Sequence, residues 1–481
     1  MMRRTKIIAT TGPATDRPGI LEKLFIEGTD VFRLNYSHQT HAHHERRLSE
    51  IRAFSKKYKR AVGIIADLQG PKIRLEHFSS GKVLLREGAA FSIDTELATN
   101  AGDEKHVGVS YKDLPHDVHA DDTLLIDDGR IVLRVKDIHG HEIICEVVTG
   151  GELTDAKGIN LKGGGLSAGA LTDKDKADLE HAVKIGADFI AISFVRCAND
   201  IHLARQILNN LDSKARIIAK IERAEALENI EEIIEGSDAI MIARGDLGVE
   251  IGDAALPPVQ KQLIKMARDM DRAAITATQM MESMINNQMP TRAEVFDVAN
   301  AIIDGTDAVM LSAETSIGKY PDKVVADMSR ICTEAEKQRI TQVSDHRLNL
   351  RFEAIDEAIA MATMYSANHI GARAIAALTE TGSTCVWMSR ISSGIPIFAF
   401  TRHSATRRRV TLYRGVYPIK FDITHTDPLM ANKEIIQELL ARNVVTNGDY
   451  VVITKGDLLG TRGGTNNMKI IKVGEALEHS L

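Results

Sequence analysis

Cysteine pairs, long apolar runs and a strong excess of one charge are all missing from this chain of 481 residues. The four cysteines stand far apart without Cys-x-x-Cys spacing, which excludes a disulfide framework and favours unpaired thiols in a reducing cytosol. They are Cys145, Cys197, Cys332 and Cys385. No apolar run reaches transmembrane length, and the first residues lead into an apolar segment without a signal peptide. A soluble, cytoplasmic protein is therefore expected.

The charge balance excludes another class of protein. A net charge of −6 and a pI near 6.3 argue against bulk affinity for nucleic acid or membranes, so the arginines at 407–409 are interpreted as a solvated or intersubunit face. The histidines between His38 and His44 lack the cysteine or carboxylate partners of a closed zinc site. The glycines at 163–165 lack the Lys-Ser/Thr of a P-loop and are interpreted as a hinge.

Eight apolar, β-branched runs recur along the chain with gaps of helix length or more between them. They are Lys6–Thr11, Val31–Ser37, Ala61–Leu68, Phe189–Phe194, Arg216–Glu222, Ala239–Gly245, Ala273–Gln279 and Ala308–Glu314. Amphipathic stretches separate most of them, at Asp173–Ile185, Pro257–Met270 and Arg292–Ile303. Buried strands that alternate with helices indicate a parallel sheet, and eight of them predict a (β/α)₈ TIM barrel.

Two further regions depart from this alternation, as expected for a chain too long for one core. After Asp67, short alternating strands at Lys82–Leu85, Phe91–Ile93, Thr123–Leu125 and Ile131–Val135 predict a small β domain that could act as a lid. Strand candidates at Ala374–Leu378, Ile397–Phe400 and Tyr450–Lys455 predict a C-terminal α/β domain. The predicted boundaries are 1–70 and 168–343 for the barrel, 71–167 for the lid and 344–481 for the C-terminal domain.

Polar side chains gather at the C-terminal ends of the barrel strands, where such barrels carry their chemistry. They are Arg33, Asn35, Ser37, Asp67, Lys220, Glu222, Asp246, Thr278, Ser312 and Glu314. Because strand side chains alternate, Lys220 and Glu222 project to the same side. Glu222 with Asp246 supplies the hard oxygen ligands that Mg²⁺ prefers, and Lys220 would face a transferring anionic group.

Seven motifs in order carry a resemblance to one family. They are Phe32-Arg-Leu-Asn-Tyr-Ser-His38, Asp67-Leu-Gln-Gly-Pro-Lys-Ile-Arg74, Ile218-Ala-Lys-Ile-Glu222, Ala243-Arg-Gly-Asp-Leu-Gly-Val-Glu250, Ala277-Thr-Gln-Met280, Pro290-Thr-Arg-Ala-Glu294 and Met310-Leu-Ser-Ala-Glu-Thr315. From about Thr5 to the C-terminus the chain closely resembles pyruvate kinase. The resemblance implies phosphoryl transfer from phosphoenolpyruvate to ADP, giving pyruvate and ATP in the last step of glycolysis. It also implies Mg²⁺ or Mn²⁺, a homotetramer and an allosteric site in the C-terminal domain.

The resemblance assigns roles to residues of these motifs. Lys220 would stabilise the migrating phosphoryl group, Arg33 would clamp the phosphate, and Glu222 and Asp246 would hold the metal. The amides of Gly245 and Asp246 with the Thr278 hydroxyl would bind the substrate carboxylate, and Thr278 and Ser312 would serve the proton path. Asn35, Ser37, Asp67 and Leu68 would form the monovalent-cation region, and Asn35, His38, Arg74 and Lys157 would meet the nucleotide.

One departure from the family pattern lies in the third-strand motif. Most members have an acidic residue after Gly-Pro, where this chain has Lys72. A tethered ammonium there would replace the K⁺ that sits beside the substrate phosphate in the acidic members. Leu68, Gln69 and Leu75 also match the K⁺-independent branch of the family, so K⁺ is expected not to be required.

The C-terminal domain carries a candidate effector loop after its first strand candidate. Its proposed ligands are Thr379, Thr381, Gly382, Ser383 and Thr384, hydroxyls and amides at a helix start that suit a phosphate dianion. The second loop, Gly460–Thr465, looks shorter than in members activated by fructose bisphosphate. A phosphorylated monosaccharide or a nucleoside monophosphate is the expected activator.

Two other functions remain open at this point. One is another Mg²⁺-dependent barrel that acts on phosphoenolpyruvate or a 2-oxo acid, such as an aldolase or lyase, although such a barrel has no reason to carry the lid. The other is an inactive regulatory homologue, which would require the loss of Arg33, Lys220, Glu222, Asp246 or Thr278. All five are present.

Overall fold

The barrel predicted from the sequence is present in a computed structural model that describes residues 2–343, 351–422, 428–456 and 464–475. Eight parallel strands close on themselves in the order β1, β16, β15, β14, β13, β12, β3 and β2. Their bounds are β1 Lys6–Thr10, β2 Val31–Asn35, β3 Gly63–Asp67, β12 Phe189–Ile192, β13 Arg216–Ile221, β14 Ala239–Ala243, β15 Ala273–Ala277 and β16 Ala308–Leu311. Every predicted barrel run contains one of these strands, and polar residues follow each run's apolar core at the C-terminal end.

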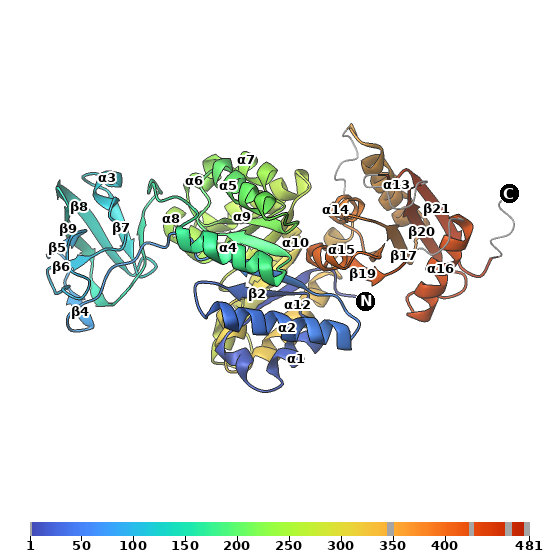
Figure 1. Cartoon of the computed structure of the whole chain (residues 1–481), viewed down its shortest axis with the longest axis horizontal. Helices are drawn as coiled ribbons and strands as arrows, with labels where there is room; N and C mark the ends of the chain where they lie inside the picture. The colour runs from blue at the N-terminus through green and yellow to red at the C-terminus, as the bar shows by residue number, and fades with distance from the viewer. Residues whose placement is uncertain (1, 344–350, 423–427, 457–463, 476–481) are drawn as a thin grey trace.

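Helices surround the barrel (Figure 1). The longer ones are α1 Ile20–Ile26, α2 His41–Lys57, α4 Asp173–Ile185, α5 Ala198–Asn210, α7 Ile230–Gly236, α8 Arg244–Ile251, α9 Leu256–Asp269, α10 Arg292–Asp304 and α12 Pro321–Ala335. Single turns lie at η1 Pro13–Asp16, α6 Glu225–Glu228, η2 Glu282–Ile285, α11 Ala313–Ser316 and η3 Arg339–Thr341. Capping boxes at Thr172 and Thr291 start α4 and α10, and left-handed glycines at 186 and 305 end them. None of the helices in these ranges is long and apolar enough to cross a membrane.

An inserted domain follows β3 and has a hydrophobic core of its own. It comprises β4 Lys82–Leu85, β5 Ala90–Asp94, β6 His106–Gly108, α3 Leu114–Asp117, β7 Thr123–Ile126, β8 Ile131–His139, β9 Glu142–Thr149, β10 Gly151–Thr154 and β11 Ile159–Leu161. Six strands form the sheet β11-β7-β8-β9-β5-β6, and β10 pairs with β4. Because it emerges after the C-terminal end of β3, it lies on the side of the predicted active site, at the left of Figure 1.

The C-terminal domain is an α/β sandwich on the other side of the barrel (Figure 1). Its sheet has the order β19-β18-β17-β20-β21, in which only β21 is antiparallel to its neighbour. The strands are β17 Ala374–Leu378, β18 Ile397–Thr401, β19 Val416–Lys420, β20 Tyr450–Lys455 and β21 Asn467–Lys472. The helices are α13 Ile355–Ile370, α14 Ser383–Arg390, α15 Ser404–Arg409, η4 Val410–Leu412 and α16 Pro428–Ala441.

The barrel and the C-terminal domain share one hydrophobic cluster, which runs from inward-facing barrel residues such as Ile8 and Met241 to Met364 of α13. Buried ion pairs join the same surfaces. Arg390 at the end of α14 pairs with Asp307, the residue before β16, and each side chain is only 2% exposed. The C-terminal domain therefore covers the N-terminal ends of the barrel strands, opposite the inserted domain.

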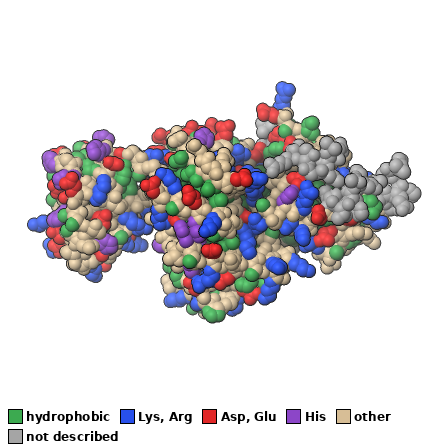
Figure 2. All heavy atoms as spheres, in the orientation of Figure 1, with side chains coloured by type: hydrophobic (Ala, Val, Ile, Leu, Met, Phe, Trp, Pro, Cys, Tyr) green, Lys and Arg blue, Asp and Glu red, His purple; other side chains and the backbone are tan. Residues whose placement is uncertain are grey.

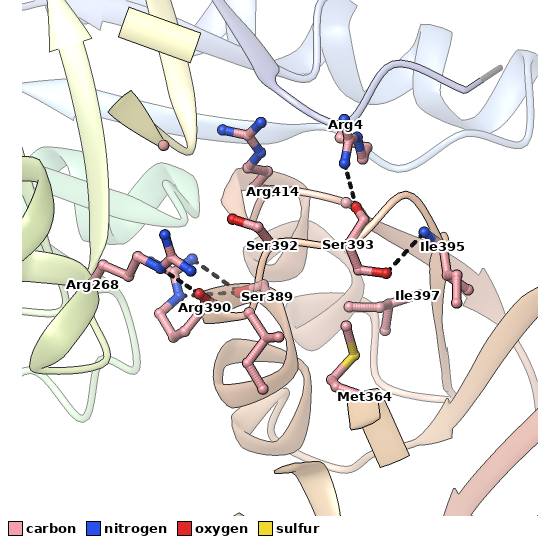
Figure 3. A pocket seen from close by; sticks show the side chains of 13 residues that line it. Arg4, Arg268, Met364, Ser389, Arg390, Ser392, Ser393, Ile395, Ile397 and Arg414 are labelled. Atoms are coloured by element: carbon pink, nitrogen blue, oxygen red, sulfur yellow. Dashed lines mark hydrogen bonds between the residues drawn. The ribbon is translucent and has the colours of Figure 1, made fainter. Parts of the chain in front are cut away.

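Arginines are concentrated at this junction. Figure 3 shows a small pocket at this junction. Four arginines from separate segments of the chain line it: Arg4, Arg268, Arg390 and Arg414. Two of the arginines at 407–409 also lie here, because the Arg408 Nε is 2.6 Å from Asp188 and Arg409 donates to a backbone carbonyl of the barrel. Their interpretation as a solvated or intersubunit face was wrong for these two, which connect domains of one chain. On the face shown in Figure 2 the remaining basic and acidic side chains are intermixed.

Candidate active site

Four charged side chains from three barrel strands meet at the C-terminal mouth. The Nε of Arg33, on β2, donates to Asp67 at 2.5 Å. The ammonium of Lys220, on β13, lies 3.3 Å from the other Asp67 oxygen and 2.8 Å from Glu222. All four side chains are at most 11% exposed. The structure therefore brings together the residues predicted to contact the transferring group.

Their electrostatics keep the lysine charged. Burial alone would lower the pKa of Lys220, but Asp67 and Glu222 outweigh burial and raise it. Burial likewise opposes ionisation of Asp67, yet Arg33 and Lys220 lower its pKa. The Lys220 Nζ also donates to Ser193 Oγ at 2.7 Å, which fixes the ammonium at the mouth. A permanent cation is thus held where a phosphoryl group could approach.

Glu222 and Asp246 form the second part of the site. One Glu222 oxygen accepts from the Phe194 amide at 2.7 Å. Burial raises the pKa of Glu222, and the neighbouring Asp246 carboxylate raises it further against the effect of Lys220. Two carboxylates that repel each other in this way favour a bound cation.

The donor set fits Mg²⁺, which commonly takes one or two protein carboxylates and completes its shell with water and substrate oxygens. Within the described ranges, no group of three or more His, Cys, Asp and Glu side chains is arranged as a metal site. A cation at this mouth would therefore depend on Glu222, Asp246 and substrate oxygens.

The first turn of α8 meets the loop after β15. The Gly245 amide donates to the Thr278 hydroxyl at 2.8 Å, so two of the three groups predicted to bind a substrate carboxylate are hydrogen-bonded to each other. Thr278 has φ +65°, a left-handed conformation that is rare for a β-branched residue and is typically stored at functional sites. A substrate carboxylate that bound here would accept hydrogen bonds from the Gly245 amide and the Thr278 hydroxyl, in place of the bond between these two groups.

Arg244 supports this strained turn. Its Nη2 donates to the Thr278 carbonyl at 2.9 Å and its Nη1 to Asp297 at 2.7 Å. No role was predicted for Arg244, although a charged residue directly after an apolar strand is a usable signal in the sequence; the structure shows it to be buried. Arg244 is therefore a positioning residue for Thr278.

Ser312 and Glu314 close the mouth beside β16. The Ser312 hydroxyl is buried and makes no hydrogen bond within the described part of the chain. The Glu314 carboxylate accepts from the Ser312 amide at 2.7 Å and from the Met281 amide at 3.1 Å, and burial raises its pKa. Glu314 thus ties the β16 loop to the β15 loop, and the Ser312 hydroxyl remains available to a water or ligand.

The predicted monovalent-cation residues lie at the ends of β2 and β3. Asn35 and Asp67 are paired in register, and the Asn35 side-chain oxygen accepts from the Ser37 amide at 3.1 Å. Leu68 is buried, and its carbonyl accepts from Ser193 Oγ at 2.8 Å. Lys72 is directed elsewhere, because its ammonium contacts Asp246 Oδ1 at 3.0 Å.

The residues predicted to meet the nucleotide are divided between two domains. Asn35 and the exposed His38 lie on the barrel. Arg74 donates to the Ala156 carbonyl at 2.9 Å, and the Lys157 ammonium is 2.8 Å from Asp127, so both are held within the inserted domain. A nucleotide that used all four would bridge the two domains.

The last strand of the inserted domain, β11, and the linker that follows it at 162–172 are both hydrogen-bonded to the barrel. The Asn160 side chain donates to Glu250 at 3.2 Å, and the Leu166 carbonyl accepts from Arg223 at 2.8 Å. The three glycines at 163–165 all have positive φ, a conformation that favours glycine, and the hinge predicted there stays a prediction. Burial raises the pKa of Glu250 to about 7. The linker is thus anchored at both ends of the glycine run.

The candidate effector loop connects β17 to α14. The Gly382 amide donates to Thr379 Oγ1 at 2.8 Å, and Thr381 donates to Ser383 Oγ at 3.1 Å. Thr384 is hydrogen-bonded at 3.0 Å to Thr465, the last residue of the predicted second loop. Residues 460–463 of that loop lie outside the described residues.

Comparisons with known proteins agree along the whole chain. The family model described as pyruvate kinase, barrel domain, matches residues 2–325, and the one described as pyruvate kinase, alpha/beta domain, matches residues 357–471. Pyruvate kinase II of Salmonella typhimurium is 51% identical over 476 residues, covering 98% of this chain and 99% of the relative. Pyruvate kinase of Corynebacterium glutamicum is 40% identical over 99% of this chain and 98% of its own. A crystal structure of a pyruvate kinase from Cryptosporidium parvum superposes with a TM-score of 0.91 at 34% identity, covering 98% of this chain and 96% of that one.

Proposed function

Since this chain belongs to the pyruvate kinase family, we propose that its barrel mouth carries out the family's reaction with the residues gathered there. The reaction moves the phosphoryl group of phosphoenolpyruvate to ADP and leaves pyruvate and ATP. The observation that carries the residue assignment is the buried Lys220 held between Asp67 and Glu222, with Asp246 beside them. Phosphoryl transfer requires a protein to hold charged groups in fixed positions around the transferring phosphate.

Each residue has a distinct task in this proposal. Lys220 follows the phosphoryl group as a compact charge, and Arg33 orients the phosphate through its planar donors. Glu222 and Asp246 would hold Mg²⁺ or Mn²⁺, which when bound supplies the charge that offsets phosphate and enolate oxygens. The Gly245 and Asp246 amides with the Thr278 hydroxyl would orient the substrate carboxylate. The hydroxyls of Thr278 and Ser312 would then deliver a proton to the enolate carbon through water.

A coupled assay for pyruvate separates this proposal from its rivals. We expect pyruvate to form from phosphoenolpyruvate only when ADP is added, with ATP in equal amount. An aldolase or lyase would act on phosphoenolpyruvate or a 2-oxo acid without transferring phosphate to ADP, and an inactive homologue would form no pyruvate.

Lys72 bears on whether the enzyme requires K⁺. Lys72 stands where most members have an acidic residue, so we expect nearly full activity with Mg²⁺ and no K⁺, and a K⁺ requirement in Lys72→Glu. Steady-state rates are compared in tetramethylammonium buffer with and without KCl. Stimulation of the native enzyme by more than about tenfold, equal to about 1.4 kcal/mol, would contradict the tethered-cation hypothesis.

Effector binding is proposed at the 379–384 loop, where hydroxyls and amides converge at the start of α14. We expect a sugar monophosphate or a nucleoside 5′-monophosphate to activate at subsaturating phosphoenolpyruvate. Ser383→Ala should weaken activation by about tenfold, the effect of one hydrogen bond to a charged group. The matched control is Thr446→Ala, which removes a hydroxyl from an exposed turn of the same domain.

Activation that is unchanged in both Ser383→Ala and Thr381→Ala would reject the loop as the effector site. The next place to examine would be a cavity of about 970 Å³ between the barrel and the C-terminal domain. It is lined by the cations Arg3, Lys6, Arg60, Arg373 and Arg442, among other residues.

A homotetrameric assembly and a cytoplasmic location are also proposed for this chain. Support for a contact between copies comes from Met289, which precedes α10, and Phe296, in its second turn, whose exposed fractions are 76% and 71%. Large apolar side chains in such positions are typical of interfaces. Light scattering gives the mass in solution directly.

A further inference from the structure

Lys72 forms an ion pair with Asp246, a carboxylate that the proposed function assigns to the divalent metal. Its ammonium is 3.0 Å from Asp246 Oδ1, and the two side chains are 30% and 22% exposed. The distance makes this a direct, charge-assisted hydrogen bond. Lys72 comes from the outgoing linker to the inserted domain, 174 residues before its partner. One ion pair therefore connects the linker to the metal-binding end of the barrel.

The backbone that carries Lys72 is seated closely on the barrel. The Lys72 amide donates to the Gly70 carbonyl at 2.9 Å, and the Gly70 amide donates to Asp175 at 2.9 Å. Gly70 has φ +69°, and a Cβ there would come within 2.8 Å of Ser193 and Phe194. The Lys72 Cε in turn lies 3.4 Å from where a Cβ of Gly158 would be. These contacts limit the places that the ammonium can reach to the mouth and its immediate surroundings.

The charges at the mouth are balanced by this contact. Lys220 accompanies Glu222, and Lys72 accompanies Asp246, so two carboxylates face two ammoniums. A divalent cation on Glu222 and Asp246 would bring two positive charges to the same oxygens. The cation would then repel the Lys72 ammonium. It would also take up the Asp246 oxygen to which the ammonium donates its hydrogen bond.

We propose that Lys72 is a tethered counter-ion with two positions: on Asp246 in the metal-free protein, and beside the substrate phosphate once a divalent cation binds. This inference rests on the proposed function of Glu222 and Asp246. It means that Lys72 competes with the metal before substrate arrives and assists the substrate afterwards. The same side chain therefore makes metal binding weaker and phosphoenolpyruvate binding stronger.

The two positions predict effects of opposite sign in Lys72→Met. Without substrate, Mn²⁺ titrated into the full-length protein and followed by electron paramagnetic resonance should bind about three- to tenfold more tightly than in the native protein. With Mn²⁺ saturating, phosphoenolpyruvate should bind more weakly by a similar factor. Lys72→Arg, which keeps a charge that can reach Asp246, should restore both affinities toward the native values.

Two control variants separate the possible failures. Lys162→Met removes an exposed lysine from the return linker and should change Mn²⁺ affinity by less than twofold, which excludes a general effect of net charge. Asp246→Asn should weaken Mn²⁺ binding strongly. If it does not, the metal assignment fails and the proposal fails with it.

If Asp246→Asn loses Mn²⁺ but Lys72→Met binds Mn²⁺ no more tightly than the native protein, only the counter-ion proposal is overturned. Equal tightening by Lys162→Met and Lys72→Met would overturn it as well. Melting curves accompany each variant, and Lys72→Gln serves as a second neutral replacement should the methionine disturb the linker.

Discussion

Replacing Lys220 with methionine is expected to lower kcat by about a hundredfold to a thousandfold, with Mn²⁺ affinity retained. The side chain keeps its volume but loses the charge that would follow the phosphoryl group, and one preorganised electrostatic contact commonly contributes a factor of about 10² to 10³. Removal of the charge also leaves Asp67 and Glu222 without the ammonium between them. Their greater negative potential should preserve or strengthen cation binding, so the loss would lie in the chemical step.

Lys6→Met is the matched control for Lys220→Met. Lys6 is also buried on a barrel strand, but its ammonium donates to the Val416 carbonyl at the opposite end of the barrel. We expect its kcat to stay within about threefold of the native value, since it touches no reacting group. A decrease of less than about tenfold in Lys220→Met, equal to about 1.4 kcal/mol, would remove Lys220 from the proposed role.

The second large effect is expected on stability, in Asp307→Asn. The Asp307 carboxylate accepts two hydrogen bonds from the Arg390 guanidinium. It also accepts one from the Arg414 amide and one from the Ala274 amide, each at 3.0 Å. Neutralising it leaves Arg390 buried without its counter-charge, and breaking a buried pair in this way costs about 3–5 kcal/mol. Urea unfolding monitored by circular dichroism measures the loss.

Glu334→Gln gives the comparison for a surface pair, because Glu334 and Lys337 are 73% and 57% exposed. Its effect should stay below about 1 kcal/mol. Equal effects of Asp307→Asn and Glu334→Gln would mean that the Arg390–Asp307 pair does not hold the two domains together.

The barrel was predictable because its strands are buried on both faces. Continuous apolar runs such as Ile217 to Ala219 are typical of strands in a parallel sheet, and the gaps between runs are long enough for helices. Edge strands and antiparallel strands were harder to predict from the sequence. The strand β9 alternates half-buried and buried residues over Glu142–Val147, but apolar residues on both faces, such as Ile143 and Ile144, hid that pattern. The strand β21 carries two lysines on a half-exposed edge.

The candidate site was predictable as far as it depends on strand ends. Lys220 and Glu222 share one strand, and the closed barrel brings Arg33 and Asp67 to the same mouth. The contact between Lys72 and Asp246 could not be predicted, since it depends on how a linker turn sits against a distant helix. The left-handed Thr278 was equally hidden, because propensity excludes the conformation and only the surrounding contacts, including Arg244, enforce it.

The shared hydrophobic cluster gives the chain an energetic order that differs from its covalent order. The inserted domain interrupts the barrel in sequence but has a separate core. The C-terminal domain comes last in sequence, yet one of its two hydrophobic clusters is continuous with the barrel interior. Cooperative units follow cores, so the molecule should unfold as two units, with the barrel and the C-terminal domain forming one. Truncation before α13 would expose the apolar residues at the N-terminal end of the barrel, including Ile8 and Met241. The remaining barrel would lack part of its hydrophobic core.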